Sequence, residues 1–142
     1  MEGVRSMANV NRVLALIYAI GLGIGEAAIN WGHWQYAPLW IIDYVIVFWL
    51  IGGVFAGRHA AFVLFGGWAF ALAVMWMALA VVTDPGNASV MEPSPAINGL
   101  MALLAFLALA GLALSAGQYR AERTLRQADG VDVPFRSDRG AC

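Results

Sequence analysis

Four long apolar runs, each about as long as a membrane-crossing helix, constrain this chain more than any other feature. They cover residues 13–31, 38–57, 60–82 and 97–117 of the 142-residue sequence. A helix needs about 20 predominantly apolar residues to cross the hydrocarbon core. A spanning strand would show alternating polarity over about 9–11 residues, and these runs do not alternate. The sequence therefore predicts an all-α integral membrane protein, built as an antiparallel bundle of four transmembrane helices.

The overall composition agrees with a chain that lies mostly in lipid. Hydrophobic residues make up 61% of the sequence, against about 45–50% in typical globular domains. The formal net charge is only -1, and no basic stripe with interleaved aromatic residues is present, which argues against nucleic-acid binding. The expected partner of most of this surface is the lipid bilayer.

The connections between the runs predict how the helices are ordered. The joining segments at 32–37 and 58–59 are very short, so the first three helices are expected to be antiparallel neighbours. The third connection is longer and rich in proline, glycine and serine, as a solvent-exposed loop would be. We expect a membrane domain over residues 1–117 and a polar tail over 118–142, whose first turns can continue the last helix.

The arginines predict the orientation of the chain. They precede the first run, join the second to the third and follow the fourth, whereas the two loops on the other side contain neither arginine nor lysine. The positive-inside rule then places both termini in the cytoplasm. All eight basic residues are arginine, which indicates a GC-rich bacterial genome and hence the inner membrane as the location.

The first run also has features of a secretory signal peptide. It follows Arg5 and Arg12, and the small residues around Glu26 form a tolerable cleavage site. Its apolar stretch is longer than a typical signal core, and a short hairpin partner follows at once, which favours a membrane span. Both interpretations stay open at this stage.

Two acidic residues inside the apolar runs, Glu26 and Asp43, are the leading candidates for function. Carboxylates within hydrocarbon are costly and usually face a partner, a cavity or a bundle interior. The first connection is centred near Trp34, eight residues after Glu26 and nine before Asp43, so both acids should lie at similar depth on adjacent helices. This predicts an outward-opening site for a proton, a cation or a small polar ligand. Alternatively, both acids reach water at the interface.

Two further polar residues extend this predicted site. Asn30 and His33 follow Glu26 at i+4 and i+7, so the three share one face if the helix continues that far. The predicted binding residues are therefore Glu26, Asp43, Asn30 and His33. Such oxygen and nitrogen groups can hold a divalent ion, but their spacing matches no established metal signature, and no metal is predicted.

Cofactor and catalytic motifs are not found in the sequence. His33 and His59 flank the second run on opposite membrane faces, which excludes a haem held by both. The lone cysteine, Cys142, makes neither an internal disulfide nor a redox pair. We predict no cofactor and no catalytic residue, so an enzyme using the Glu/His/Asp cluster is only a further alternative.

Glycine faces suggest a second class of function. Small residues separated by three positions let membrane helices approach closely, within one chain or between chains. Such pairs occur in three of the runs, as Gly21–Gly25, Gly53–Gly57 and Gly111–Ser115. A homo-oligomer, or an accessory subunit of a larger membrane complex, would use such faces without requiring any chemistry of the acids.

Overall fold

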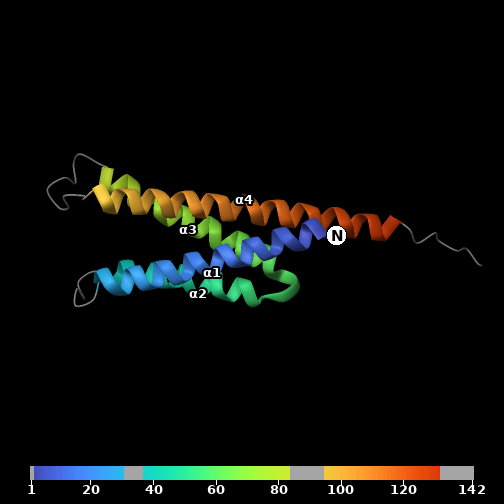
Figure 1. Ribbon diagram of the computed structural model, residues 1–142, viewed down its shortest axis with the longest axis horizontal. Coiled ribbons are helices and arrows are strands. Elements are labelled where there is room, and N and C mark those ends of the chain that lie inside the picture. The colour runs from blue at the N-terminus through green and yellow to red at the C-terminus, as the bar shows by residue number, and fades with distance from the viewer. Residues whose placement is uncertain (1, 31–36, 84–94, 132–142) are drawn as a thin grey trace, which may run out of the picture.

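The computed structural model describes residues 2–30, 37–83 and 95–131, and this part of the chain is helical without strands. Four α-helices follow one another: α1 (Glu2–Asn30), α2 (Ala37–Phe55), α3 (Ala60–Thr83) and α4 (Pro95–Val131), with a short 3-10 helix η2 (Gly57–His59) between α2 and α3. Each long helix packs against two others, in the cyclic order α1, α2, α3, α4 (Figure 1).

Three of the helices are long and apolar enough to cross a membrane, within Glu2–Ala28, Gly57–Ala80 and Gly99–Leu125. The described apolar part of α2, Trp40–Phe55, is shorter. Many large apolar side chains point outward, including Phe48, Trp76 and Phe106, which are 65–70% exposed. A surface of this kind suits lipid far better than water. The chain is therefore a helical protein with the properties of a membrane protein.

The first and last helices extend well beyond the predicted runs. α1 begins at Glu2 rather than at residue 13, and α4 continues to Val131 rather than ending at 117. The two extensions lie side by side, with the N-terminus of α1 next to the second half of α4 (Figure 1). Gly117 of α4 faces the Met7 sulfur, 3.3 Å from where a Cβ would stand. The start of α1 and the second half of α4 are thus in contact where α1 passes Gly117.

The α2–α3 connection is a tight turn that depends on one glycine. Gly57 has a φ of +56°, in the left-handed region that side chains with a Cβ disfavour. The Ala56 amide donates to the Gly53 carbonyl at 3.3 Å, and the His59 amide donates to the Ala56 carbonyl at 3.1 Å. The turn lies at the same end of the molecule as the N-terminus of α1 (Figure 1). We call this the turn end, and the opposite end, where α1 stops and α2 begins, the hairpin end.

Trp68 of α3 is the centre of the core. It is fully buried, and its ring stands edge-on to Tyr18 of α1, with centroids 5.1 Å apart and planes at 79°. On α4, Gly111 accommodates the same indole, because a Cβ built there would collide with it. Trp68 thus contacts both α1 and α4.

The interface between α2 and α3 is also built on glycine. Cβ atoms at Gly53 and Gly67 would stand only 2.7 Å from Leu64 and 2.9 Å from Leu50, so these two glycines bring the helices together. Trp49 donates from Nε1 to the Val63 carbonyl at 3.1 Å. By contrast, a Cβ at Gly21 or Gly25 would meet nothing within 4 Å, so this pair makes no close packing contact within the described chain.

Candidate functional site

The two intramembrane acids come from neighbouring helices at the hairpin end. Glu26 lies on the last turns of α1 and Asp43 on the second turn of α2, and both are half-buried. Asp43 interacts electrostatically with Glu26 across the α1–α2 interface. The structure therefore places the two acids that the sequence singled out on adjoining helices at the same end of the molecule.

Close packing of α1 on α2 positions the pair. Gly23 precedes Glu26 by three residues, and a Cβ there would lie 3.8 Å from Val47, in ordinary contact. The Tyr44 hydroxyl donates to the Gly23 carbonyl at 3.3 Å. Since Tyr44 follows Asp43 directly, this bond fixes α2 against α1 within one helical turn of the acids.

The two oxygens of Asp43 have different environments. Its Oδ1 atom is buried and has no hydrogen-bond partner among the described residues, although the side chain as a whole is only half-buried. Buried polar atoms are nearly always hydrogen bonded, to protein or to ordered water. An Oδ1 in this position can accept a hydrogen bond from a ligand.

Tyr18 adds a third polar group on the core side of the pair. Tyr18, Leu22 and Glu26 follow at i, i+4 and i+8, so they lie along one face of α1. Tyr18 is 1% exposed, and its hydroxyl has no hydrogen-bond partner within the described chain. Asp43 acts electrostatically on Tyr18 across the α1–α2 interface. The sequence analysis did not identify Tyr18, although its i+8 relation to Glu26 is the signal that indicates it.

A second polar cluster, also missed by the sequence analysis, lies nearer the turn end. Asn11 of α1 is fully buried: its Nδ2 donates to Ser115 Oγ at 2.8 Å and to Gln118 Oε1 at 3.4 Å. Its Oδ1 accepts from Trp68 Nε1 at 3.0 Å. Gln118 in turn donates to Glu122 Oε1 at 2.9 Å. These bonds join α1, α3 and α4, and their role is to hold the three helices in register.

The other two predicted site residues cannot be compared with the structure. His33 lies outside the residues that the structure describes. Asn30 is the last residue of α1, but its side chain is not among those described. Their membership of the site stays a prediction. His59 is exposed on η2, where Arg58 Nε donates to its Nε2 at 3.2 Å. In the part of the chain that is described, no three metal-ligating side chains group together.

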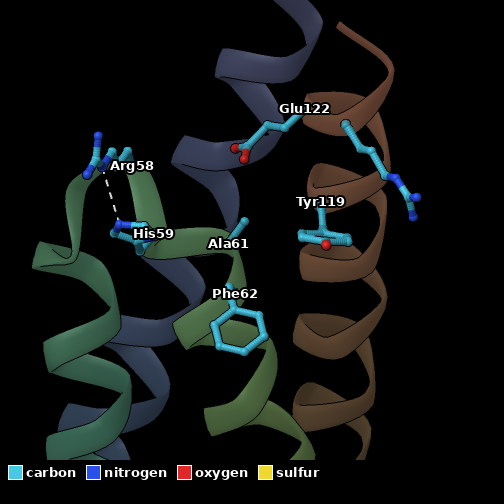
Figure 2. Close-up of a pocket in the computed structure, with 7 residues that line it drawn as sticks. Arg58, His59, Ala61, Phe62, Tyr119 and Glu122 are labelled. Carbon is cyan, nitrogen blue, oxygen red and sulfur yellow. Dashed lines mark hydrogen bonds between the residues drawn. The ribbon is translucent and has the colours of Figure 1, made fainter. Parts of the chain in front are cut away.

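An open pocket of about 500 Å³ lies at the turn end, far from the acid pair along the helices. Figure 2 shows Arg58 and His59 on one wall, while Tyr119 and Glu122 stand on α4 and Glu122 extends toward the intervening space. The pocket mixes both signs of charge, and its arginines are exposed. It therefore offers neither the burial nor the single-sign charge that distinguishes the Glu26–Asp43 site.

Comparison with known proteins gives no independent indication of function. No protein-family model, curated protein or solved structure matches the chain. The functional argument therefore depends on the side chains themselves.

Proposed function

We propose that this chain is a four-span membrane protein that binds a proton or a small cation at the Glu26–Asp43 pair. In this proposal both termini lie in the cytoplasm of a bacterial cell, the turn end faces the cytoplasm, and the pair opens toward the outer side of the inner membrane. The observation that carries the proposal is the position of the two acids on closely packed neighbouring helices, where Asp43 Oδ1 is buried without a hydrogen-bond partner among the described residues.

The energetics of the membrane support a functional role for the pair. Each carboxyl group costs at least about 2 kcal/mol near the centre of a bilayer, less toward the interface, and such residues usually mark ligand or proton sites. Sharing one proton lowers this cost, because the pair then carries one negative charge instead of two. The remaining charge attracts a proton or a cation from the adjacent aqueous side.

The test is a proton count on protein reconstituted in liposomes. The external pH is stepped between roughly 5 and 8 while an impermeant dye reports the protons taken up per chain. The double variant Glu26→Gln/Asp43→Asn should take up about one proton fewer than the wild type, since amides keep the shape but do not titrate. Glu122→Gln is the matched control, because it removes an acid at the turn end. Equal uptake by the wild type and the double variant would refute the proposal.

An accessory subunit of a larger membrane complex is the second candidate. It is favoured by Gly21 and Gly25, whose surface is open within the described chain, whereas Gly53 and Gly111 are used in internal packing. Small residues on an outward face allow close approach of another membrane helix. The mass of the purified protein in detergent separates a self-sufficient protein from an orphan subunit. The enzyme alternative gains no specific support.

A further inference from the structure

The open pocket at the turn end combines positive charge with exposed aromatic rings. Its walls come from η2, the first turn of α3 and the second half of α4, and its volume is about 500 Å³. Two arginines line it from different elements, Arg58 on η2 and Arg123 on α4. Arginine suits a phosphate group particularly well, because its planar fork can donate two parallel hydrogen bonds to the phosphate oxygens.

Both arginines have charge to offer to a ligand. Arg58 Nε donates to His59 Nε2 at 3.2 Å, which leaves the two terminal amino groups of this guanidinium for other partners. The His59 amide donates to the Ala56 carbonyl at 3.1 Å, so the backbone of the turn that carries Arg58 is fixed. Within the described chain, neither Arg58 nor Arg123 forms an ion pair with a carboxylate.

The pocket lies at the level where two apolar spans end. Arg58 is the second residue of the span Gly57–Ala80, and Arg123 lies two residues before the end of the span Gly99–Leu125. Because these helices run in opposite directions, the start of one span and the end of the other meet at the turn end (Figure 1). Phospholipid headgroups occupy this level of a membrane, just outside the hydrocarbon core.

Aromatic side chains line the pocket together with the arginines. Phe62 is 69% exposed and Tyr119 is 49% exposed. Figure 2 shows the Phe62 ring farther along α3 from the turn than His59, and thus farther into the span. Charged groups at the boundary, with apolar rings on the membrane side of them, fit a headgroup and the beginning of its acyl chains.

One carboxylate in the pocket limits the charge of the ligand. Glu122 Oε1 accepts from Gln118 Nε2 at 2.9 Å, and the buried Gln118 holds this carboxylate in place. His59 accepts a hydrogen bond through Nε2, and an accepting ring nitrogen carries no proton, so this imidazole is neutral. Two arginines and one glutamate leave a net charge of one positive unit. A ligand with a net charge of one negative unit balances it.

We propose that this pocket binds the headgroup of an anionic phospholipid that carries a single phosphodiester charge, as phosphatidylglycerol does. Arg58 and Arg123 donate to the phosphate oxygens, and the acyl chains pass Phe62 into the bilayer. Basic pockets between membrane helices bind anionic headgroups in the same way. This proposal is independent of the proposed function, since the Glu26–Asp43 pair lies at the hairpin end.

The experiment is native mass spectrometry of the purified full chain in a nonionic detergent. The protein is titrated with phosphatidylglycerol or with phosphatidylcholine of the same acyl chains, and the fraction of chains that retain one lipid gives the affinity. Phosphatidylglycerol should bind at least about tenfold more tightly, because each arginine favours a negative lipid by roughly fivefold. Phosphatidic acid carries more charge on its phosphomonoester. It should bind no more tightly than phosphatidylglycerol, because Glu122 repels the additional charge.

Variants test the contribution of the two arginines. Arg58→Gln and Arg123→Gln each remove one charge from an exposed side chain, and each should weaken phosphatidylglycerol binding about fivefold. Arg120→Gln is the matched control. Arg120 is exposed on the same helix, three residues before Arg123, but it does not line the pocket. Its replacement should change the affinity by less than about twofold, because the lipid then loses only a distant charge.

Equal affinity for phosphatidylglycerol and phosphatidylcholine, or an equal loss in all three variants, would overturn the proposal. Tighter binding of phosphatidic acid than of phosphatidylglycerol would overturn the assignment to a phosphodiester. Glycerol 3-phosphate that displaces phosphatidylglycerol would show that a free phosphate ester, rather than a lipid, is the ligand. None of these results changes the proton count at the acid pair, so the two proposals fail separately.

Discussion

Replacing Asn11 with leucine should destabilise the protein, because the change leaves a buried indole N–H without an acceptor. Asn11 is fully buried and accepts from Trp68 Nε1 at 3.0 Å. An unsatisfied buried donor costs about 1–3 kcal/mol, whereas interhelical hydrogen bonds in membrane proteins average about 0.6 kcal/mol. Ser115 can turn its hydroxyl to its own helix, and Gln118 keeps its bond to Glu122. We therefore expect a loss of about 1–2 kcal/mol in the free energy of unfolding, mostly from Trp68.

The assay is reversible unfolding in mixed micelles with increasing dodecyl sulfate, followed by circular dichroism. Asn9→Leu is the matched control, since Asn9 is exposed one half-turn away on the same helix, and it should change stability by less than about 0.5 kcal/mol. A double-mutant cycle with Trp68→Phe isolates the hydrogen bond, because the cost of the smaller ring cancels. We expect an interaction free energy of about 1 kcal/mol between the Asn11→Leu and Trp68→Phe substitutions. Coupling near zero, or an equal loss in Asn9→Leu, would refute the reasoning.

Three further predictions concern packing, topology and assembly. Gly111→Ala should cost about 1–3 kcal/mol in unfolding free energy, because its Cβ would collide with Trp68; Gly99→Ala, which meets nothing within 4 Å, should not destabilise the protein in the same assay. Reporter tags on both termini should score as cytoplasmic, and a C-terminal tag on the outside would contradict the proposed orientation. If Gly21 and Gly25 form an interface with a second copy, leucine at both positions should reduce the detergent-corrected mass to that of one chain; an unchanged oligomer would exclude this face.

The apolar helices and the neighbouring positions of the two acids could be predicted from the sequence for simple physical reasons. Length and hydropathy identify a membrane span, because the thickness of the hydrocarbon core sets the number of residues. A short connection fixes two helices as antiparallel neighbours, and counting from its centre gives the depth of each residue. That counting placed Glu26 at the depth of Asp43, and in the structure the two acids lie on adjoining helices at the hairpin end.

The Asn11 cluster and the position of Tyr18 could not be predicted in the same way. Asn11 precedes the first apolar run, and its bonds reach residues 104 and 107 positions away on α4. Which faces of α1 and α4 meet depends on side-chain packing, which periodicity alone does not determine. The extension of α1 before residue 13 was missed because its polar first turns give no signal of a membrane span, whereas the first turns of the tail were expected to continue the last helix. Polar residues at i, i+3 and i+7 on α4, Ser115, Gln118 and Glu122, were the available signal.

Infrared spectroscopy of the carboxyl groups tests the central claim, that Glu26 and Asp43 share one proton inside the membrane. A protonated carboxyl group has a carbonyl stretch separate from those of carboxylates and amides, and a buried acid retains it at neutral pH. The wild type in lipid at neutral pH should show this band, and Glu122→Gln should keep it. Both Glu26→Gln and Asp43→Asn should lose or shift it, because either change ends the sharing of the proton. A wild-type spectrum without the band, or a band that neither variant alters, would contradict the account.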